Sequence, residues 1–525
     1  MRLAKAAARL ENAVSPKLDT MLRVGWAVVL ACFLILAIGS LVGVLSKDES
    51  AFAYVAKGFL NGEIPYVDRW DQKGPLTYVL SLIGVLINDL WGIRVLAGVF
   101  LIGSTVAAYK LIRNGFGQLA AFFATTTLLV YYARLDPGGL TEHYALLFQF
   151  LALHAFVRIE RQAGAGLPLA FLVGVLGAAA FLLRPNLVGV WLAMGIYWII
   201  RDRGIPVRMW AAVLGGSTAL VVVAGLLLLV GGLSAFWDAT FTYNFHAYGE
   251  ASSPADRLWT LRHGRSVLLP VVVIFVCAWF VALYAVVFRP ELPGGDHPLV
   301  RLAVVLAPLE LLLVSVSGYG YAHYYIALLP AILLLLSFAV WFVVEQRHVA
   351  ATFLSVVLLI GSAHYYRAYD AVPKTISRVK SDVGRGDLRY QFADRIRQTT
   401  SPGDTVLVWG FQPLVHLVAE RDSPTRYFYQ FPLMMPGYTS RALIDGFTQD
   451  VRAKVPAAIL DQRDHRLPPL DHTARSQWRG APRYLDDATL FDALFDFVDE
   501  NYEAVEKRSD WVLYALKTPN SASSR

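Results

Sequence analysis

Cysteine and charge are both scarce in this sequence. Only Cys32 and Cys277 occur among 525 residues, and each lies inside an apolar run. Two isolated cysteines indicate neither a disulfide framework nor a cysteine-based metal site. Cysteines inside apolar runs usually pack as small hydrophobic residues. Charged residues make up 17% of the chain against 56% hydrophobic ones, and the mean hydropathy is +0.48. One soluble core cannot bury that much apolar surface, so the composition predicts a protein whose main solvent is the lipid bilayer.

Basic residues outnumber acidic ones by 47 to 40, which gives a formal net charge of +7 and a pI of about 9.2. In a soluble protein this balance would suggest nucleic-acid binding. Here the basic residues lie mainly between apolar runs, where they set membrane topology and contact anionic lipid. We therefore predict membrane lipids, and no nucleic acid, among the partners.

The first apolar run covers residues 24–45 and follows a basic N-terminus. It is longer than the roughly 7–15 residues of a signal-peptide core and suits a hydrocarbon layer of about 30 Å. We interpret it as a retained helix with its N-terminus in the cytoplasm. Further apolar segments cover 76–113 (broken near Asn88 and Asp89), 119–133, 142–157, 167–183, 187–200, 209–230, 266–288, 300–317, 322–344 and 349–366. The sequence thus predicts a mainly α membrane fold with about eleven spans.

The orientation can be predicted from the loops between these segments. With about eleven spans, the basic loops fall on the cytoplasmic side, as the positive-inside rule requires. These loops carry Lys110, Arg113, Arg158, Arg161, Arg201, Arg203, Arg208, Arg289, Arg301 and Arg347. The acidic loops then face outward, and we expect a multi-pass protein of the bacterial inner membrane.

The composition changes sharply after about residue 370, where charges and prolines return. We predict a transmembrane module over 1–369 and a soluble extracytoplasmic α/β domain over 370–525. Alternating patterns predict strands over 404–409, 456–460 and 511–516. Helices are expected over 388–399, 412–420, 440–453 and 488–505.

The first outer loop, 46–75, concentrates groups that carry chemistry. Asp48 and Glu49 follow the first span, and Asp71 and Lys73 precede the next. Two adjacent carboxylates could simply be solvated where the first span ends. Charged residues lie on both sides of a short helical stretch, however, which favours one site at the membrane surface where these side chains come together. Such a site would hold both a base and a cation. Glycosyl transfer from a lipid phosphate needs a carboxylate to accept the acceptor's proton and a cation or donors for the departing phosphate.

The same loop resembles the first extracytoplasmic loop of bacterial GT-C glycosyltransferases, the superfamily of protein O-mannosyltransferases and the lipid A aminoarabinose transferase. The matching residues are Asp48, Glu49, Tyr54, Ala56, Leu60, Gly62, Pro65, Tyr66, Asp68, Trp70, Asp71, Lys73 and Pro75. The resemblance implies Asp48 as the catalytic base and Lys73 as a phosphate ligand, in an enzyme that uses a polyprenyl-phosphate sugar and inverts the anomeric centre. Gly74 departs from the pattern, since a second proline is common there.

Two further groups are candidates in later loops. Asp136, Glu142 and His143 lie around the second outer loop. Glu142 can face the interior of the helix bundle and position the acceptor. Alternatively, it can stabilise the start of a helix. Arg184 is a candidate ligand for the donor phosphate, or a snorkelling arginine at a helix end.

A final candidate group precedes the span at 322–344. His323 and Tyr324 lie in a stretch that resembles the family's His-Tyr-Tyr motif, which implies contact with the sugar or phosphate, although an aromatic belt would look alike. Where related sequences carry an arginine, this chain has Tyr319 and Gly320. His465 and His472 have aspartates nearby, but their surroundings favour a solvated loop over a metal site.

These patterns together predict an inverting GT-C glycosyltransferase that moves a sugar from a polyprenyl-phosphate donor to an extracytoplasmic glycan, lipid or protein. No glycine-rich phosphate loop is present, which agrees with a donor already attached to lipid. No cofactor or metal is assigned, and metal dependence stays open. The alternatives are a transporter or flippase, which should carry ionisable groups on broken helices near mid-bilayer, and a non-catalytic scaffold.

Overall fold

A computed structural model describes residues 24–27, 31, 43–135, 138–161, 166–250, 252–269, 271–292, 294–345 and 386–517. The predicted span at 349–366, most of that at 24–45, and Asp136 lie outside these residues. The chain forms two compact units. The helical unit comprises Met1–Val42, Arg94–Val222 and Ala255–Lys380, and the mixed unit comprises Gly43–Ile93, Val223–Pro254 and Ser381–Arg525.

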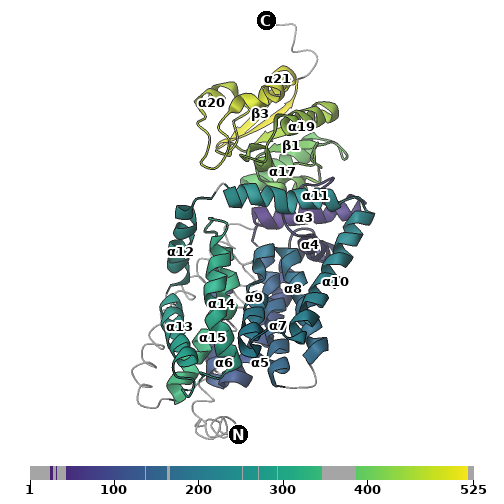
Figure 1. Ribbon diagram of the computed structural model, residues 1–525. Helices are drawn as coiled ribbons and strands as arrows, with labels where there is room; N and C mark the ends of the chain where they lie inside the picture. The colour runs from purple at the N-terminus through teal and green to yellow at the C-terminus, as the bar shows by residue number, and fades with distance from the viewer. Residues whose placement is uncertain are drawn as a thin grey trace. The chain divides into compact units, whose positions relative to one another are not determined.

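The described residues are mainly helical, and the apolar runs form the helices expected of them (Figure 1). These are α4 (Pro75–Ile87), α5 (Gly92–Phe116), α6 (Gln118–Arg134), α7 (Thr141–Arg161), α8 (Gly166–Leu183), α9 (Gly189–Asp202), α10 (Val207–Leu229), α13 (Val271–Val287), α14 (Pro298–Ser315) and α15 (Leu329–Glu345). Helix α12 (Pro254–Leu268) lies almost wholly before the predicted segment 266–288 and was not expected.

Five segments among the described residues are long and apolar enough to cross a membrane, or six if α12 and α13 count as one broken span. They are α5, α8, α10, α14 and Ala322–Val343, the last of which joins the 3-10 helix η4 (Ala322–Leu328) to α15. Large apolar side chains on these helices are exposed, Leu229 by 83%, which is the surface that lipid covers. The protein is therefore a multi-pass membrane protein, while the count of eleven spans stays a prediction.

The apolar stretch 76–113 is broken where the sequence indicated. Helix α4 ends at Ile87, and α5 begins at Gly92. The side chain of Asn88 accepts hydrogen bonds from the backbone N–H groups of Leu90 (3.0 Å) and Trp91 (3.1 Å). Asparagine therefore satisfies donors that a continuous helix would have paired, and the chain turns there.

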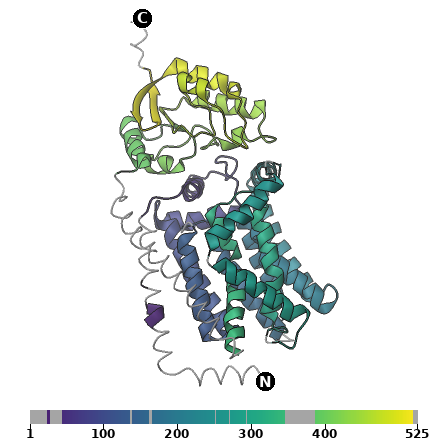
Figure 2. The same ribbon diagram turned by 90° about the vertical axis from the view of Figure 1, so that its left-hand side faces the viewer.

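Among the described residues, the mixed unit contains one four-stranded sheet, which lies in the green-to-yellow C-terminal part of the chain (Figure 2). Its strand order is β1-β2-β4-β3. Strand β1 (Val406–Trp409) is parallel to β2 (Ala458–Asp461), and β4 (Trp511–Leu516) is antiparallel to both β2 and β3 (Tyr502–Arg508). The helices are α17 (Leu388–Thr399), α18 (Pro413–Ala419), α19 (Arg441–Lys454), α20 (His472–Gln477) and α21 (Asp492–Asn501).

One prediction in this region is wrong. The helix expected over 488–505 ends at Asn501, and the next seven residues form β3. Most residues of β3 are exposed and four of its seven are charged, so its sequence lacks the apolar alternation of a half-buried strand. Pairing with β4, which begins after a two-residue turn, overrides that polar composition.

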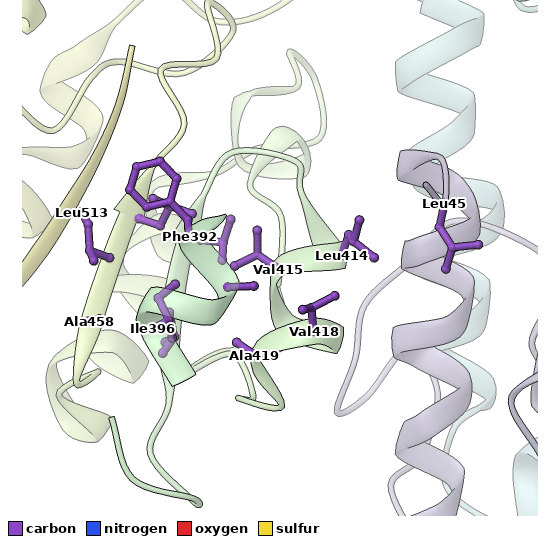
Figure 3. Packing of buried hydrophobic residues seen from close by; sticks show 13 residues of the cluster. Leu45, Phe392, Ile396, Leu414, Val415, Val418, Ala419, Ala458 and Leu513 are labelled. Carbon is purple, nitrogen blue, oxygen red and sulfur yellow. The ribbon is translucent and has the colours of Figure 1, made fainter. Parts of the chain in front are cut away.

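An apolar cluster joins the first loop to the sheet and its helices within the mixed unit. Phe392 and Ile396 of α17, Leu414 of α18 and Leu460 of β2 are almost completely buried there, together with Leu45 at 2% exposure. Figure 3 shows Leu414 pointing toward Leu45. This packing holds the start of the first loop against the C-terminal part of the chain, which positions the residues discussed next.

Candidate active site

Helix α3 (Lys47–Leu60) begins with a reciprocal capping arrangement. The Ser46 hydroxyl accepts a hydrogen bond from the Glu49 backbone N–H at 3.2 Å, and the Glu49 carboxylate accepts one from the Ser46 N–H at 2.9 Å. This Ser-x-x-Glu capping box satisfies two helix-terminal donors. Glu49 is 1% exposed, so its carboxylate is occupied in starting the helix.

Asp48, the other predicted carboxylate, lies in the first turn of α3 and is only partly buried. Within the described part of the chain, no hydrogen bond or ion pair engages its side chain. A negative charge in the first turn is favoured by the helix dipole. Asp48 is therefore an available carboxylate on a fixed helix start.

Asp71 follows on the other side of the loop and is 3% exposed. Its carboxylate accepts hydrogen bonds from the hydroxyls of Tyr78 (3.0 Å) and Tyr429 (2.8 Å) and from the Gln72 N–H (2.8 Å). Burial raises the pKa of Asp71, while the charge of Lys73 opposes that rise and the charge of Asp48 adds to it. The three charged side chains thus lie within electrostatic reach of one another.

Lys73 has a fixed backbone and an available amine. Its carbonyl accepts hydrogen bonds from the hydroxyls of Tyr66 (2.8 Å) and Thr240 (3.4 Å). No hydrogen bond or ion pair to another described residue occupies its ammonium group, which is partly buried. A positioned lysine of this kind is suited to an anionic ligand such as phosphate.

Arg69 organises the loop, and the sequence reasoning did not identify it. Its guanidinium lies 4.1 Å from the Tyr54 ring centroid and pairs with Glu63 and with Asp422, the latter at 2.9 Å. It also donates to the Tyr54 carbonyl at 2.6 Å. Arg69 is 5% exposed, and Asp422 lies 353 positions further along the chain. No local sequence pattern indicates this long-range partner.

An aromatic cluster next to this arginine joins the first loop to two later segments. The ring of Trp70 lies 4.8 Å from that of Tyr243, 5.7 Å from that of Tyr429 and 5.8 Å from that of Tyr427. The Trp70 backbone N–H donates to the Arg426 carbonyl at 2.9 Å. Aromatic contacts of this geometry stabilise beyond the area they bury, so the loop carrying Asp71 and Lys73 is held rigidly.

The remaining described candidates gather in the helical unit. Arg184 pairs with Glu142 at 2.6 Å and lies 3.8 Å from the ring centroid of Tyr324. Glu142 is 2% exposed and also accepts from the Thr141 hydroxyl at 2.9 Å. His143 is fully buried, and its Nδ1 accepts from the Leu140 N–H at 3.3 Å. Glu142 thus lies in the first turn of α7, in agreement with a helix-start role, and neutralises Arg184. Its positioning of the acceptor stays a prediction.

His323 lies in a row of parallel rings in the helical unit. Tyr321 stacks on Tyr319 at 5.7 Å and on His323 at 5.8 Å, with interplanar angles of 3° and 10°. Tyr321 is 47% exposed. His323 also contacts Tyr324 edge-on at 4.8 Å, so the predicted pair is together, beside Arg184.

Glu310 in α14 is a buried carboxyl that the sequence reasoning missed. It is fully buried, and neither carboxylate oxygen has a hydrogen-bond partner among the described residues. Its side chain packs so closely on Gly189, the first residue of α9, that a Cβ at that glycine would overlap it. Helices α8 and α9 are separated by the short 3-10 turn η1 (Pro185–Leu187), so the carboxyl lies beside a helix break.

The predicted site residues therefore form two groups. Asp48, Glu49, Asp71 and Lys73 lie in the mixed unit, whereas the later candidates lie in the helical unit. Where the structure describes the chain, no three histidine, cysteine, aspartate or glutamate side chains gather as a metal site. Asp461 and Asp464, near the two late histidines, instead pair with Arg463 and Arg466.

The fold is similar to that of solved ArnT structures, which are GT-C glycosyltransferases. The chain resembles the crystal structure of ArnT from Cupriavidus metallidurans bound to undecaprenyl phosphate, with 14% identity and a TM-score of 0.59 over 95% of this chain and 98% of that one. Apo ArnT from the same organism matches at 14% identity and a TM-score of 0.54, over 94% and 98%. No family model and no curated protein sequence matches the chain. The GT-C resemblance seen in the first loop is confirmed at the level of the fold.

Proposed function

We propose that this protein is an inverting glycosyltransferase that transfers a sugar from a polyprenyl-phosphate donor to an extracytoplasmic acceptor. The observation that carries the proposal is the pairing, within one loop, of an unengaged carboxylate on Asp48 with an unengaged amine on Lys73, both coupled to buried Asp71. The GT-C fold supports it, since ArnT with that fold has been crystallised with undecaprenyl phosphate bound.

In the proposed reaction, Asp48 accepts the proton of the acceptor hydroxyl. The hydroxyl oxygen attacks the anomeric carbon and forms the new glycosidic bond. The bond from that carbon to the phosphate oxygen breaks, and polyprenyl phosphate leaves with the electron pair. A positioned base contributes a factor of about 10²–10⁴, and a cation that meets the developing phosphate charge is worth several kcal/mol in a site shielded from water.

Lys73 is the proposed ligand of the departing phosphate. Its amine is unengaged, whereas the charge of Arg184 is neutralised by Glu142. We therefore assign Arg184 a positioning role, in which it orders Tyr324 through their stacking contact. His323 is proposed to donate a hydrogen bond to the sugar or phosphate. Glu49 is assigned to the start of α3, which orients the neighbouring base.

A strain that lacks the gene, complemented with wild-type or Asp48→Asn protein, tests the proposal. Mass spectrometry of the cell-envelope glycans, lipids and proteins should show one sugar missing in the deletion strain, restored by the wild type and not by Asp48→Asn. Asp68→Asn provides the matched control, because Asp68 lies in the same loop and only caps the Ile64 N–H at 2.7 Å. Full restoration by Asp48→Asn would remove the proposed base.

Transport of a lipid-linked or envelope component is the second candidate function. Glu310 favours it, because an ionisable group on a membrane helix beside a helix break is typical of transporters. The same strains separate the two functions: movement of a lipid-linked sugar across the membrane without a new glycosidic bond, lost in Glu310→Gln and kept in Asp48→Asn, would favour transport.

A further inference from the structure

Lys47 immediately precedes the proposed base and is the residue on which this inference rests. Its ammonium lies 5.9 Å from the centroid of the Phe411 ring. In the described part of the chain it has no hydrogen bond or ion pair. A partly buried lysine without a paired carboxylate is costly, and a bound anion would compensate its charge.

The two arginines close to Lys47 already have carboxylate partners. Arg389 binds Asp387 at 2.6 Å, and Arg466 binds Asp464 at 2.8 Å. Each arginine is therefore paired with a carboxylate of its own, whereas Lys47 has no ion pair among the described residues, although the charges of Asp464 and Asp48 both act on it. Burial lowers the pKa of Lys47 even though Asp464 acts to raise it, which agrees with an undercompensated charge.

The surroundings of Lys47 have the position of a ligand site in α/β folds. Phe411 follows the carboxyl end of β1, and Arg466 follows that of β2, its parallel neighbour. Ligands of open α/β sheets bind outside the carboxyl ends of parallel strands. Arg389 also donates to the Leu45 carbonyl at 3.2 Å, which fixes the segment just before Lys47.

A series of aromatic ring contacts connects this position to the proposed catalytic loop. The ring of Phe411 lies 4.5 Å from that of Tyr429, whose hydroxyl donates to Asp71 at 2.8 Å. On the other side Phe411 lies 5.5 Å from Phe431, which packs under Arg466 at 3.8 Å. Tyr429 and Phe431 are buried, whereas Phe411 is partly exposed. A flat apolar ring beside a cation suits a sugar ring that carries a negative charge.

We propose that Lys47 binds an anionic group, phosphate or carboxylate, of the sugar-containing acceptor, whose ring stacks on the partly exposed ring of Phe411. The inference rests on the proposed function, because the bound group is assigned to the acceptor and Lys47 directly precedes the proposed base Asp48. It adds that the acceptor is anionic. The C-terminal α/β part of the mixed unit then contributes to acceptor recognition through Phe411 and Arg466.

Binding of small probes to the purified full-length protein tests this inference. Glucose, glucose 6-phosphate and glucuronate are titrated in saturation-transfer NMR experiments against the wild type, Lys47→Gln, Lys47→Arg and Lys57→Gln. Lys57 is the matched control, because it lies on the same helix and pairs with Asp89 at 2.7 Å. The two anionic sugars distinguish phosphate from carboxylate as the recognised group.

We expect at least one anionic sugar to bind the wild type about tenfold more tightly than glucose, the size of one charge-assisted hydrogen bond. The preference should survive in Lys57→Gln and Lys47→Arg and disappear in Lys47→Gln. Equal binding of all three sugars by the wild type, or an unchanged preference in Lys47→Gln, would overturn the inference.

The binding experiment can fail or succeed independently of the test of the proposed function. Asp48→Asn should keep the preference for anionic sugars, because it leaves Lys47 in place. If Asp48→Asn transfers sugar normally while Lys47→Gln abolishes the preference, the proposed base falls and the anion site stands. If Asp48→Asn is inactive while Lys47→Gln keeps the preference, the reverse holds.

Discussion

Replacing Glu49 with glutamine separates a structural role from a catalytic one. In the structure the Glu49 carboxylate accepts a hydrogen bond from the Ser46 N–H at 2.9 Å. A glutamine oxygen can accept the same bond, since Glu and Gln both serve in a capping box. We therefore expect Glu49→Gln to change the free energy of unfolding by less than about 0.5 kcal/mol, whereas Glu49→Ala should cost about 1 kcal/mol or more through the lost cap.

The expected effect on turnover is equally specific. A lost general base would reduce turnover by about 10²–10⁴-fold, so Glu49→Gln should stay within a few-fold of the wild type. Amide hydrogen exchange over the first turn of α3, compared between Glu49→Gln, Glu49→Ala and Ser46→Ala, reports the cap directly. If Glu49→Gln lost about 100-fold in turnover while the exchange of that turn stayed unchanged, Glu49 would share the chemistry and the structural assignment would be refuted.

Three further variants test other parts of the structure. Burial lowers the pKa of His416 from 6.5 to about 4, so the unfolded state takes up a proton at a higher pH than the folded state does. The contribution of His416 to stability is therefore complete above pH 6.5 and is lost as the pH falls toward 4. In thermal unfolding measured across this range, His416→Asn should show a weaker dependence of melting temperature on pH. Arg69→Met removes a buried arginine that bonds Glu63, Asp422 and the Tyr54 carbonyl, and should cost about 1.5–3 kcal/mol in denaturant unfolding. Lys57→Met at a partly exposed pair should cost less than about 1 kcal/mol. Equal costs would contradict the organising role of Arg69. Gly189→Ala should lower the melting temperature, because the added Cβ overlaps Glu310, and Gly189→Ala combined with Glu310→Ala should recover part of the loss.

Local patterns in the sequence were sufficient for most of the fold. The length and spacing of the apolar runs predicted helices α5 to α10 and α14, and Asn88 indicated the break before α5. The strand at 502–508 was missed because its residues are polar and its stability comes from pairing with β4. Predictions of this kind fail where tertiary pairing overrides local composition.

The candidate site could be predicted only in part, for a related reason. The carboxylates and lysine of the first loop are close in sequence, so their chemistry was visible there. The Ser46-x-x-Glu49 pattern is also a capping-box signature. It was missed because Asp48 and Glu49 were interpreted together as a pair of acidic residues. The partners contributed by Asp422, Tyr429 and Phe411 are more than 300 positions away, and no local pattern indicates them.

Release of polyprenyl phosphate by the purified full-length protein tests the central claim most directly. Wild type, Asp48→Asn and the control Asp68→Asn are incubated with a polyprenyl-phosphate sugar and an extract of cell-envelope acceptors, and the released lipid phosphate and the new glycoside are both quantified. We predict release in step with glycoside formation for the wild type and Asp68→Asn, and a loss of about 10²-fold or more for Asp48→Asn. Equal turnover by Asp48→Asn would contradict the assignment of Asp48 as the base.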